Sequence, residues 1–284
     1  MEITVSAPAK INLMLDVTGK RSDGYHTLIT IIQSISLADT VIISESESNS
    51  ITVKTSNSTI PSDKNNIAYI AAEKFISYTK VKHNGLNIFI EKKIPSEAGL
   101  GGGSADAAAV LIGLNKLFGT NLSLDELCRI GITVGADVPF CIAGGTKICT
   151  GIGEIMEDTA SLEQCYIVIA KGTSGICTKT AFEKIDSIGF ENTLSADSYD
   201  GSINSLKNNG GNKFEAVSDN SDIQHIKEKM YSNGAEYSAM TGSGSAVFGL
   251  FLDKENADKC IYELVNSDIF AYLCTPISRG AAIT

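Results

Sequence analysis

The chain has 284 residues, 43% of them hydrophobic, and a formal net charge of −10 at pH 7. Its length suits one large domain or two ordinary ones, and no apolar run approaches the roughly 18 residues that a membrane helix needs. A nucleic-acid-binding protein would show a basic excess or stripe, so we expect neither nucleic acid nor a membrane as a partner.

Strands dominate the predictions at the start of the chain. Residues 1–5 are acidic and typical of a strand, not of a basic leader before an apolar segment. Apolar stretches bounded by Gly, Asp and Asn predict strands over residues 11–17, 28–37 and 86–94. Residues 44–50 are polar and acidic, so we expect them to form the tip of a hairpin.

Two helices are indicated in the same half. Apolar residues recur at helical spacing within residues 63–78. Ser123 to Glu126 reads Ser-Leu-Asp-Glu, a capping box, and predicts a helix that ends near Gly131.

The second half continues this mixture and completes a two-lobed α+β fold with a junction near residue 150. Residues 191–212 are rich in Ser, Asn, Asp and Gly, which predicts a surface loop. The other predicted elements are strands over residues 166–170, 246–252 and 270–275 and helices over 223–230 and 257–265.

The seven cysteines favour a cytoplasmic protein. They are odd in number, scattered from Cys128 to Cys274, and contain no C-x-x-C pair. Disulfide frameworks belong to short secreted chains, and zinc sites need closely spaced ligands. We therefore expect reduced, mostly buried thiols.

The most informative segment is the glycine-rich run over residues 95–105, Pro-Ser-Glu-Ala-Gly-Leu-Gly-Gly-Gly-Ser-Ala. It follows a predicted strand and leads into an Ala-rich helical stretch. Glycines allow positive φ and close approach of a ligand, and the free N–H groups of a helix start attract phosphate. No Lys follows as in a Walker A loop, and the last glycine of a Rossmann fingerprint is missing. The run predicts a phosphate site, the alternative being a helix start without a ligand.

Three segments in order resemble the motifs of the GHMP kinases. They are Ala-Pro-Ala-Lys-Ile-Asn-Leu at 7–13, the glycine-rich run at 95–105, and Met-Thr-Gly-Ser-Gly-Ser-Ala-Val-Phe at 240–248. Within that superfamily, the blocks at residues 19–26, 135–140 and 176–182 resemble those of the diphosphocytidyl-methylerythritol kinases. The chain departs from their pattern at Ala105, Cys177, Lys213 and Ser245.

The resemblance implies a fold and a reaction. The fold would have an N-terminal lobe resembling ribosomal S5 domain 2 (residues 1–152, binding ATP and carrying catalysis) and a ferredoxin-like C-terminal lobe (153–284, binding substrate). The reaction would transfer the γ-phosphoryl group of ATP, with Mg²⁺, to the 2-hydroxyl of 4-diphosphocytidyl-2-C-methyl-D-erythritol, a small-molecule substrate of the non-mevalonate isoprenoid route.

The resemblance also implies catalytic roles. Asp137 would be the base and Lys10 its partner, which agrees with the carboxylate and cation that phosphoryl transfer to an alcohol needs. The alternatives are a turn-forming Asp and a surface ion pair. Asn12 projects to the same face as Lys10 and is expected to position the substrate. Thr241 and Gly242 would approach the substrate diphosphate or buttress the cleft, although a simple tight hairpin is also open.

The expected nucleotide site consists of the glycine-rich run and one residue before it. Ser104 could touch Mg²⁺ through its hydroxyl, while the other metal ligands stay open. Asn66 could meet the adenine, although helix capping explains it equally well. The expected nucleotide-binding residues are Asn66, Pro95, Ser96, Glu97, Ala98, Gly99, Leu100, Gly101, Gly102, Gly103, Ser104 and Ala105.

Aromatic residues are expected to hold the cytosine. Tyr25 and His26 would supply a stacking ring and polar groups for the pairing edge. Phe182 would close the other side, with Thr178 as a nearby hydroxyl donor, unless Phe182 is a core aromatic. Two rival functions stay open: another GHMP kinase acting on homoserine, mevalonate or a sugar, and a ligand sensor without catalysis. The sequence leaves the oligomeric state undecided between monomer and homodimer.

Overall fold

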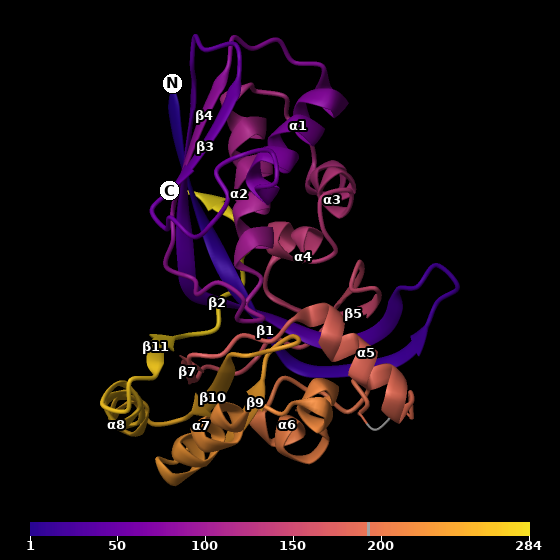
Figure 1. Ribbon diagram of the computed structural model, residues 1–284, viewed down its shortest axis with the longest axis vertical. Helices are drawn as coiled ribbons and strands as arrows, with labels where there is room; N and C mark the ends of the chain where they lie inside the picture. Colours follow the sequence, from indigo (N-terminus) through magenta and orange to yellow (C-terminus); the bar gives the residue numbers. More distant parts are fainter. Residues whose placement is uncertain (192–193) are drawn as a thin grey trace.

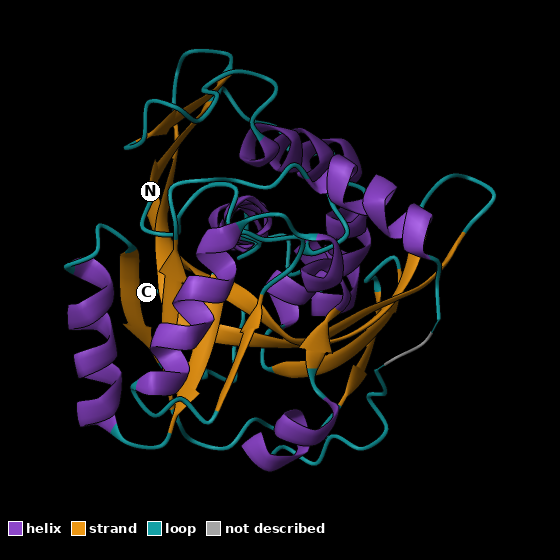
Figure 2. Ribbon diagram, turned by 60° about the horizontal axis from the view of Figure 1, so that its bottom comes forward, coloured by secondary structure: helices purple, strands orange, loops and turns teal. Residues whose placement is uncertain are grey.

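A long antiparallel pair of strands connects the two lobes of the protein (Figure 1). The structure is a computed structural model that describes residues 1–191 and 194–284. Strands β1 (Glu2–Lys20) and β2 (His26–Glu45) pair along nearly their whole length and run side by side to the loop that joins them (Figure 2). The register shifts between Pro8 and Lys10 and again between Asn12 and Met14. Such bulges bend a strand and redirect its side chains.

The first lobe is a sheet with its helices on one face (Figure 1). Its strands lie in the order β12-β1-β2-β4-β3, and the other half of β2 pairs with β5. The remaining elements of this lobe are β3 (Ile51–Thr55), α1 (Ile67–Thr79), β4 (Leu86–Glu91), α2 (Gly102–Leu117), α3 (Leu124–Ile132), α4 (Val138–Ala143), β5 (Thr146–Gly151), β6 (Ile155–Asp158), β8 (Gly211–Asn212) and β12 (Ala282–Ile283).

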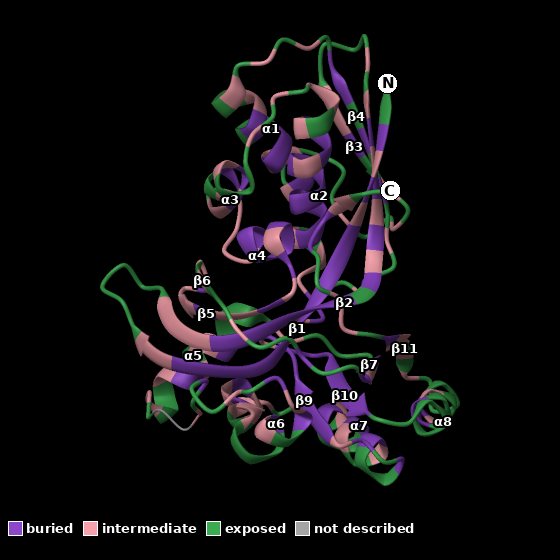
Figure 3. Ribbon diagram, turned by 180° about the vertical axis from the view of Figure 1, so that it is seen from behind, coloured by how far each residue is buried: buried purple, intermediate pink, exposed green. Residues whose placement is uncertain are grey.

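Helix α2 is the centre of this lobe because its small residues pack closely. Ala107, Ala108 and Ala109 are fully buried, and the middle of β1 and β2 is buried as well (Figure 3). Small side chains let the helix backbone lie close to the strands, where dense packing stabilises both. The glycine-rich run that precedes α2 is therefore held on a rigid part of the fold.

The second lobe has the ferredoxin-like arrangement. Its antiparallel sheet has the order β11-β7-β10-β9, with α7 between β7 and β9 along the chain and α8 between β10 and β11. The elements of this lobe are β7 (Tyr166–Lys171), α5 (Thr178–Ile188), α6 (Ile203–Asn209), the 3₁₀ helix η1 (Lys213–Val217), α7 (Ser221–Ser232), β9 (Tyr237–Met240), β10 (Val247–Phe251), α8 (Lys254–Val265) and β11 (Phe270–Cys274).

The predicted α+β fold class is confirmed, and so is the capping box. The Ser123 hydroxyl accepts from the Glu126 backbone N–H, and the Glu126 carboxylate accepts from the Ser123 N–H. The division into lobes at residues 152 and 153 stays a prediction. The chain crosses that division, because β6 pairs with β5 and β12 pairs with β1.

Two local predictions are wrong. Residues 44–50 are not a hairpin tip, because β4 lies between β2 and β3 and pairs with both. The predicted loop at 191–212 contains α6 and β8, and α6 forms because Ile203 and Leu206 are buried against the core. Residues 192–193 of that loop lie outside the described residues.

Two expectations about composition can be compared with the described residues. Each of the seven cysteines lies within them and is unpaired, and five of the seven are buried. Within the same residues, no helix has the length and apolar character that crossing a membrane requires.

Candidate active site

The glycine-rich run forms an open helix start. Gly101 has φ +68° and precedes α2, whose first turn has no side-chain cap. The first N–H groups of a helix have no partner within the helix and attract anions. A Cβ on Gly101 would lie 3.0 Å from Cγ of Lys10, so glycine at this position lets the lysine side chain pass directly beside the loop.

A cavity of about 410 Å³ lies over this run. Asn66 and the predicted residues 95–104 all line it, whereas Ala105 is 1% exposed and packs in the core. The Asn66 side chain caps α1 by accepting from the Ala68 N–H at 2.9 Å, and it donates to the Pro61 carbonyl oxygen at 2.7 Å. The capping role of Asn66 is therefore observed, and contact with an adenine stays a prediction.

A buried charged cluster borders the same cavity. The Lys92 ammonium lies 2.5 Å from Asp39 and 2.6 Å from Asp106, and all three side chains are at most 7% exposed. Burial alone would lower the pKa of Lys92, but the two carboxylates raise it. Burial is the main reason that the pKa of Asp106 is raised to about 8. The charge of Asp39 raises it further, because one ammonium cannot neutralise two carboxylates. Sequence reasoning missed this cluster, although Lys92 stands between the strand and the glycine-rich run.

Lys10 and Asp137 lie together, as predicted. The Lys10 Nζ is 3.6 Å from Asp137 Oδ2, with side-chain exposures of 5% and 37%. Asp137 directly precedes α4 but makes no capping bond with its side chain. Its carboxylate is therefore available at the cavity, and the buried ammonium beside it supplies positive charge. Such a pair can accept a proton from a hydroxyl group and orient it.

Asn12 fixes the position of Lys10. Its Oδ1 accepts from Lys10 Nζ at 2.8 Å and from the Gly242 N–H at 2.9 Å, and its Nδ2 donates to Thr30 Oγ1 at 2.8 Å. The Asn12 N–H donates to Thr241 Oγ1 at 3.0 Å. Thr241 is fully buried, so in this structure it buttresses the cleft instead of facing it. Thr30 had no recognisable signal in the sequence.

Lys10 and Asp137 line a cavity of about 220 Å³ that shares lining residues with two others. Gly99 and Gly101 line both this cavity and the cavity over the glycine-rich run. Leu28, Ile152 and Phe182 line both the cavity beside Lys10 and Asp137 and a third cavity of about 460 Å³. The three cavities are therefore neighbours, and the one that Lys10 and Asp137 line is in the middle.

Aromatic residues line the third cavity. Tyr25 is 61% exposed there, whereas the His26 side chain is 8% exposed. The His26 ring stacks on Phe182, with centroids 4.4 Å apart and planes 19° apart. His26 Nε2 lies 2.7 Å from Asp186 Oδ1. Asp186 was not predicted, although it lies one helical turn after Phe182 on the same face of α5.

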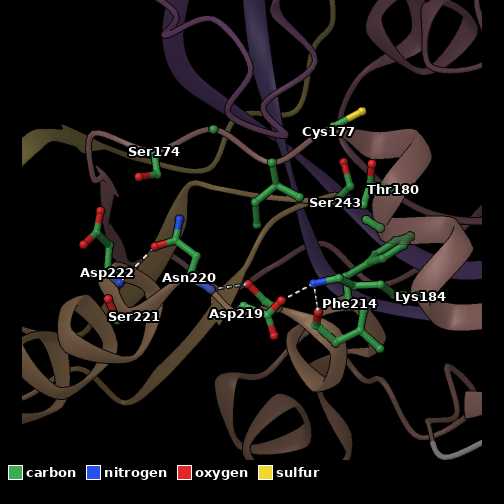
Figure 4. Close-up of a pocket in the computed structure, with 15 residues that line it drawn as sticks. Ser174, Cys177, Thr180, Lys184, Phe214, Asp219, Asn220, Ser221, Asp222 and Ser243 are labelled. Atoms are coloured by element: carbon green, nitrogen blue, oxygen red, sulfur yellow. Dashed lines mark hydrogen bonds and ion pairs between the residues drawn. The ribbon is translucent and has the colours of Figure 1, made fainter.

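A further cavity of about 420 Å³ lies between α5 and the start of α7 (Figure 4). Lys184 points across it from α5, forms an ion pair with Asp219, and donates to the Val217 carbonyl oxygen at 3.3 Å. Thr178 and Ser243 also line the cavity beside Lys10 and Asp137, and Thr178 Oγ1 is 2.8 Å from Ser243 Oγ. These bonds hold α5, and with it Phe182, against the rest of the second lobe.

Three of the four departures from the family pattern have partners other than Lys10 and Asp137. The Ser245 hydroxyl donates to the Ser174 carbonyl oxygen at 2.5 Å. Lys213 Nζ lies 3.9 Å from the buried carboxylate of Asp16. Cys177 is exposed at the start of α5, where bonds from Thr180 lower the pKa of its thiol.

The groups that could hold a metal ion are few among the described residues. In residues 1–191 and 194–284, no three His, Cys, Asp or Glu side chains are grouped to hold one. Ser104 faces the turn before Asp137, because its Oγ is 4.0 Å from the place that a Cβ on Gly135 would occupy. Ser104 lines the cavity over the glycine-rich run, and Asp137 lines the neighbouring cavity beside Lys10. A hydroxyl and a carboxylate on these two neighbouring cavities suit Mg²⁺, which is typically held by few protein groups together with phosphates and water.

Comparison with known proteins agrees with this geometry. Residues 66–145 match the GHMP kinases N terminal domain, and residues 201–268 match the GHMP kinases C terminal domain. The chain is 45% identical to a 4-diphosphocytidyl-2-C-methyl-D-erythritol kinase of Caldicellulosiruptor saccharolyticus, with 90% of each chain covered. It is 42% identical to the enzyme of that name from Clostridium tetani, with 90% of this chain and 93% of the relative covered.

A solved structure agrees as well. A crystal structure of 4-(cytidine 5'-diphospho)-2C-methyl-D-erythritol kinase superposes with a TM-score of 0.81 at 30% identity, covering 97% of this chain and 99% of the other. The chain therefore belongs to the GHMP kinases and, within them, to the family of 4-diphosphocytidyl-2-C-methyl-D-erythritol kinases.

Proposed function

We propose that the protein transfers the γ-phosphoryl group of ATP to the 2-hydroxyl of 4-diphosphocytidyl-2-C-methyl-D-erythritol. The observation that carries the proposal is that three neighbouring cavities share lining residues, with Lys10 and Asp137 at the middle one. ATP occupies the cavity over the glycine-rich run, and the cytidine occupies the cavity lined by Tyr25, His26 and Phe182. The methylerythritol unit then reaches the catalytic pair.

The reaction follows from the positions of these groups. Asp137 accepts the proton of the 2-hydroxyl as its oxygen attacks the γ-phosphorus, and the bond to the β-phosphate oxygen breaks to release ADP. Lys10 holds its charge beside the attacking oxygen, where negative charge is redistributed during transfer. Asn12 holds the Lys10 side chain in position, because its side chain accepts a hydrogen bond from the ammonium and is itself hydrogen-bonded to Gly242 and Thr30.

The N–H groups at the start of α2 bind the phosphates of ATP. Ser104 and Asp137 are the residues that would hold Mg²⁺ together with those phosphates. An ion held there would supply positive charge against the charge of the phosphates. Residues 1–152 thus supply the nucleotide site and the catalytic pair, and residues 153–284 supply Phe182 and Thr178 for the substrate.

A coupled assay of ADP release tests the proposal. The purified protein is given Mg-ATP with the cytidine substrate, and with homoserine, mevalonate or galactose in parallel. We expect turnover with the cytidine substrate alone, and its loss in Asp137→Ala. Turnover with another alcohol would contradict the substrate assignment, and absence of turnover with every alcohol would favour a ligand sensor.

A further inference from the structure

Asp186 bridges Lys20 and His26 at the edge of the aromatic cavity. One carboxylate oxygen lies 2.7 Å from His26 Nε2, and the other lies 2.5 Å from the Lys20 ammonium. Lys20 ends β1, His26 begins β2, and Asp186 belongs to α5. The carboxylate therefore links the end of the long strand pair next to its connecting loop to the helix that carries Phe182.

This contact determines which nitrogen of His26 carries a proton. Hydrogen bonds from Lys20 and then from His26 lower the pKa of Asp186, so its carboxylate is charged and only accepts. Nε2 must therefore be the protonated nitrogen. In the neutral ring, Nδ1 is then a bare acceptor.

Nδ1 is also the nitrogen left for a ligand. The ring is 92% buried, given its 8% side-chain exposure, and one of its faces is covered by Phe182. Among the described residues, no protein group forms a hydrogen bond with Nδ1. An acceptor at this place matches the 4-amino group of cytosine, whereas uracil has a carbonyl oxygen at the same position and would face it with a second acceptor.

We propose that Asp186 is a positioning residue that fixes His26 with Nδ1 as a hydrogen-bond acceptor, and that this acceptor selects cytosine over uracil. The inference rests on the proposed function, because it takes the aromatic cavity as the nucleobase site. It adds a residue that acts through His26 and a reason for discrimination between the two pyrimidines.

The variant Asp186→Asn should move the proton of the His26 ring from Nε2 to Nδ1 with little change in the shape of the side chain at position 186. The Lys20 ammonium can only donate, so it holds the amide oxygen and turns the amide NH₂ toward His26. Nε2 becomes the acceptor and Nδ1 acquires the proton. The Nδ1–H of His26 would then face the 4-amino group of cytosine, so that two donors meet in a buried contact. We therefore expect kcat/KM for the cytidine substrate to fall about tenfold or more. Activity with the uridine analogue is retained or rises, so the cytidine-to-uridine ratio falls.

Nitrogen-15 NMR of the imidazole rings reports which nitrogen of His26 is protonated. A purely structural role of Asp186 would leave this protonation pattern unchanged in the variant. The chain has three histidines, and the signals of His26 are assigned by their loss in His26→Gln. We expect protonated Nε2 in the wild type and protonated Nδ1 in Asp186→Asn. The wild-type spectrum is a test that does not depend on the folding of an Asp186 variant. A protonated Nδ1 in the wild type would overturn the inference.

A matched control separates a local effect from a general one. Asp258 forms an exposed ion pair with Lys254 at 2.7 Å on α8, far along the chain from the cavity. Asp258→Asn should leave the ring signals and the substrate ratio unchanged. An unchanged ratio in Asp186→Asn, with His26→Gln impaired, would refute the role of Asp186 alone. Full activity of both His26→Gln and Tyr25→Ala would refute the nucleobase site and, with it, the proposed function.

Discussion

Replacement of Gly99 by alanine should disrupt the site through a backbone collision. A Cβ at this position would lie 2.1 Å from the carbonyl oxygen of Thr241, and Gly99 has φ +72°. Ordinary van der Waals contact begins near 3.4 Å, so one of the two backbones must move by roughly 1 Å. The left-handed conformation costs about 1–2 kcal/mol for alanine, and overpacking adds about 1–3 kcal/mol.

The displacement would reach the catalytic pair in two steps. Thr241 accepts from the Asn12 N–H, and Asn12 holds the Lys10 ammonium. Misplacement by about 1 Å can lower a rate about 100-fold, so we expect kcat/KM of Gly99→Ala to fall by that order.

Gly119→Ala is the matched control, because Gly119 has φ +60° but nothing within 4 Å of its ideal Cβ. It should lose only the conformational part of the stability, about 1–2 kcal/mol, and keep its activity. Denaturant unfolding and the ADP-release assay measure both quantities. Equal destabilisation of the two variants, with Gly99→Ala fully active, would refute the reasoning.

Three further changes test other parts of the site. Asp137→Asn should lower kcat by about 10²- to 10⁴-fold while the protein stays folded by circular dichroism, and near-normal kcat would exclude Asp137 as the base. Tyr25→Ala should raise KM for the cytidine substrate, since stacking contributes about 1–3 kcal/mol, and leave KM for ATP unchanged; an equal change in both would argue against base stacking. The Asp106 carboxyl has a pKa of about 8 when folded against 3.8 in a free chain, so the folded state binds its proton more tightly. The free energy of unfolding should therefore decline between about pH 4 and pH 8, by up to about 1.4 kcal/mol per pH unit. Asp106→Asn should lack this decline in denaturant titrations and the exposed Asp158→Asn should keep it; parallel curves for Asp106→Asn and the wild type would contradict the assignment.

The sequence predicted best what depends on local chemistry. Four glycines within residues 99–103 and an Ala-rich stretch after them were enough to predict a phosphate-binding helix start. The capping box at Ser123 could also be predicted from the sequence, because its two hydrogen bonds join residues three positions apart. The pairing of Lys10 with Asp137 came from the family resemblance, since no local pattern joins segments so distant in the chain.

What the sequence did not predict depends on tertiary contacts. Helix α6 has only Ile203 and Leu206 to bury, and its polar remainder has the composition of a loop. The position of β4 between β2 and β3 is decided by strand pairing across the sheet. Lys92 gains its importance from two carboxylates on other elements, and Asp186 from a histidine on β2.

The position of the transferred phosphate shows which hydroxyl group the protein phosphorylates. The reaction with Mg-ATP and the cytidine substrate is run to completion, and the product is analysed by phosphorus and carbon NMR. We expect one ADP per product and a new phosphate monoester coupled to carbon 2 of the methylerythritol unit. A phosphate on another hydroxyl, or ADP formed without a phosphorylated substrate, would contradict the proposed function.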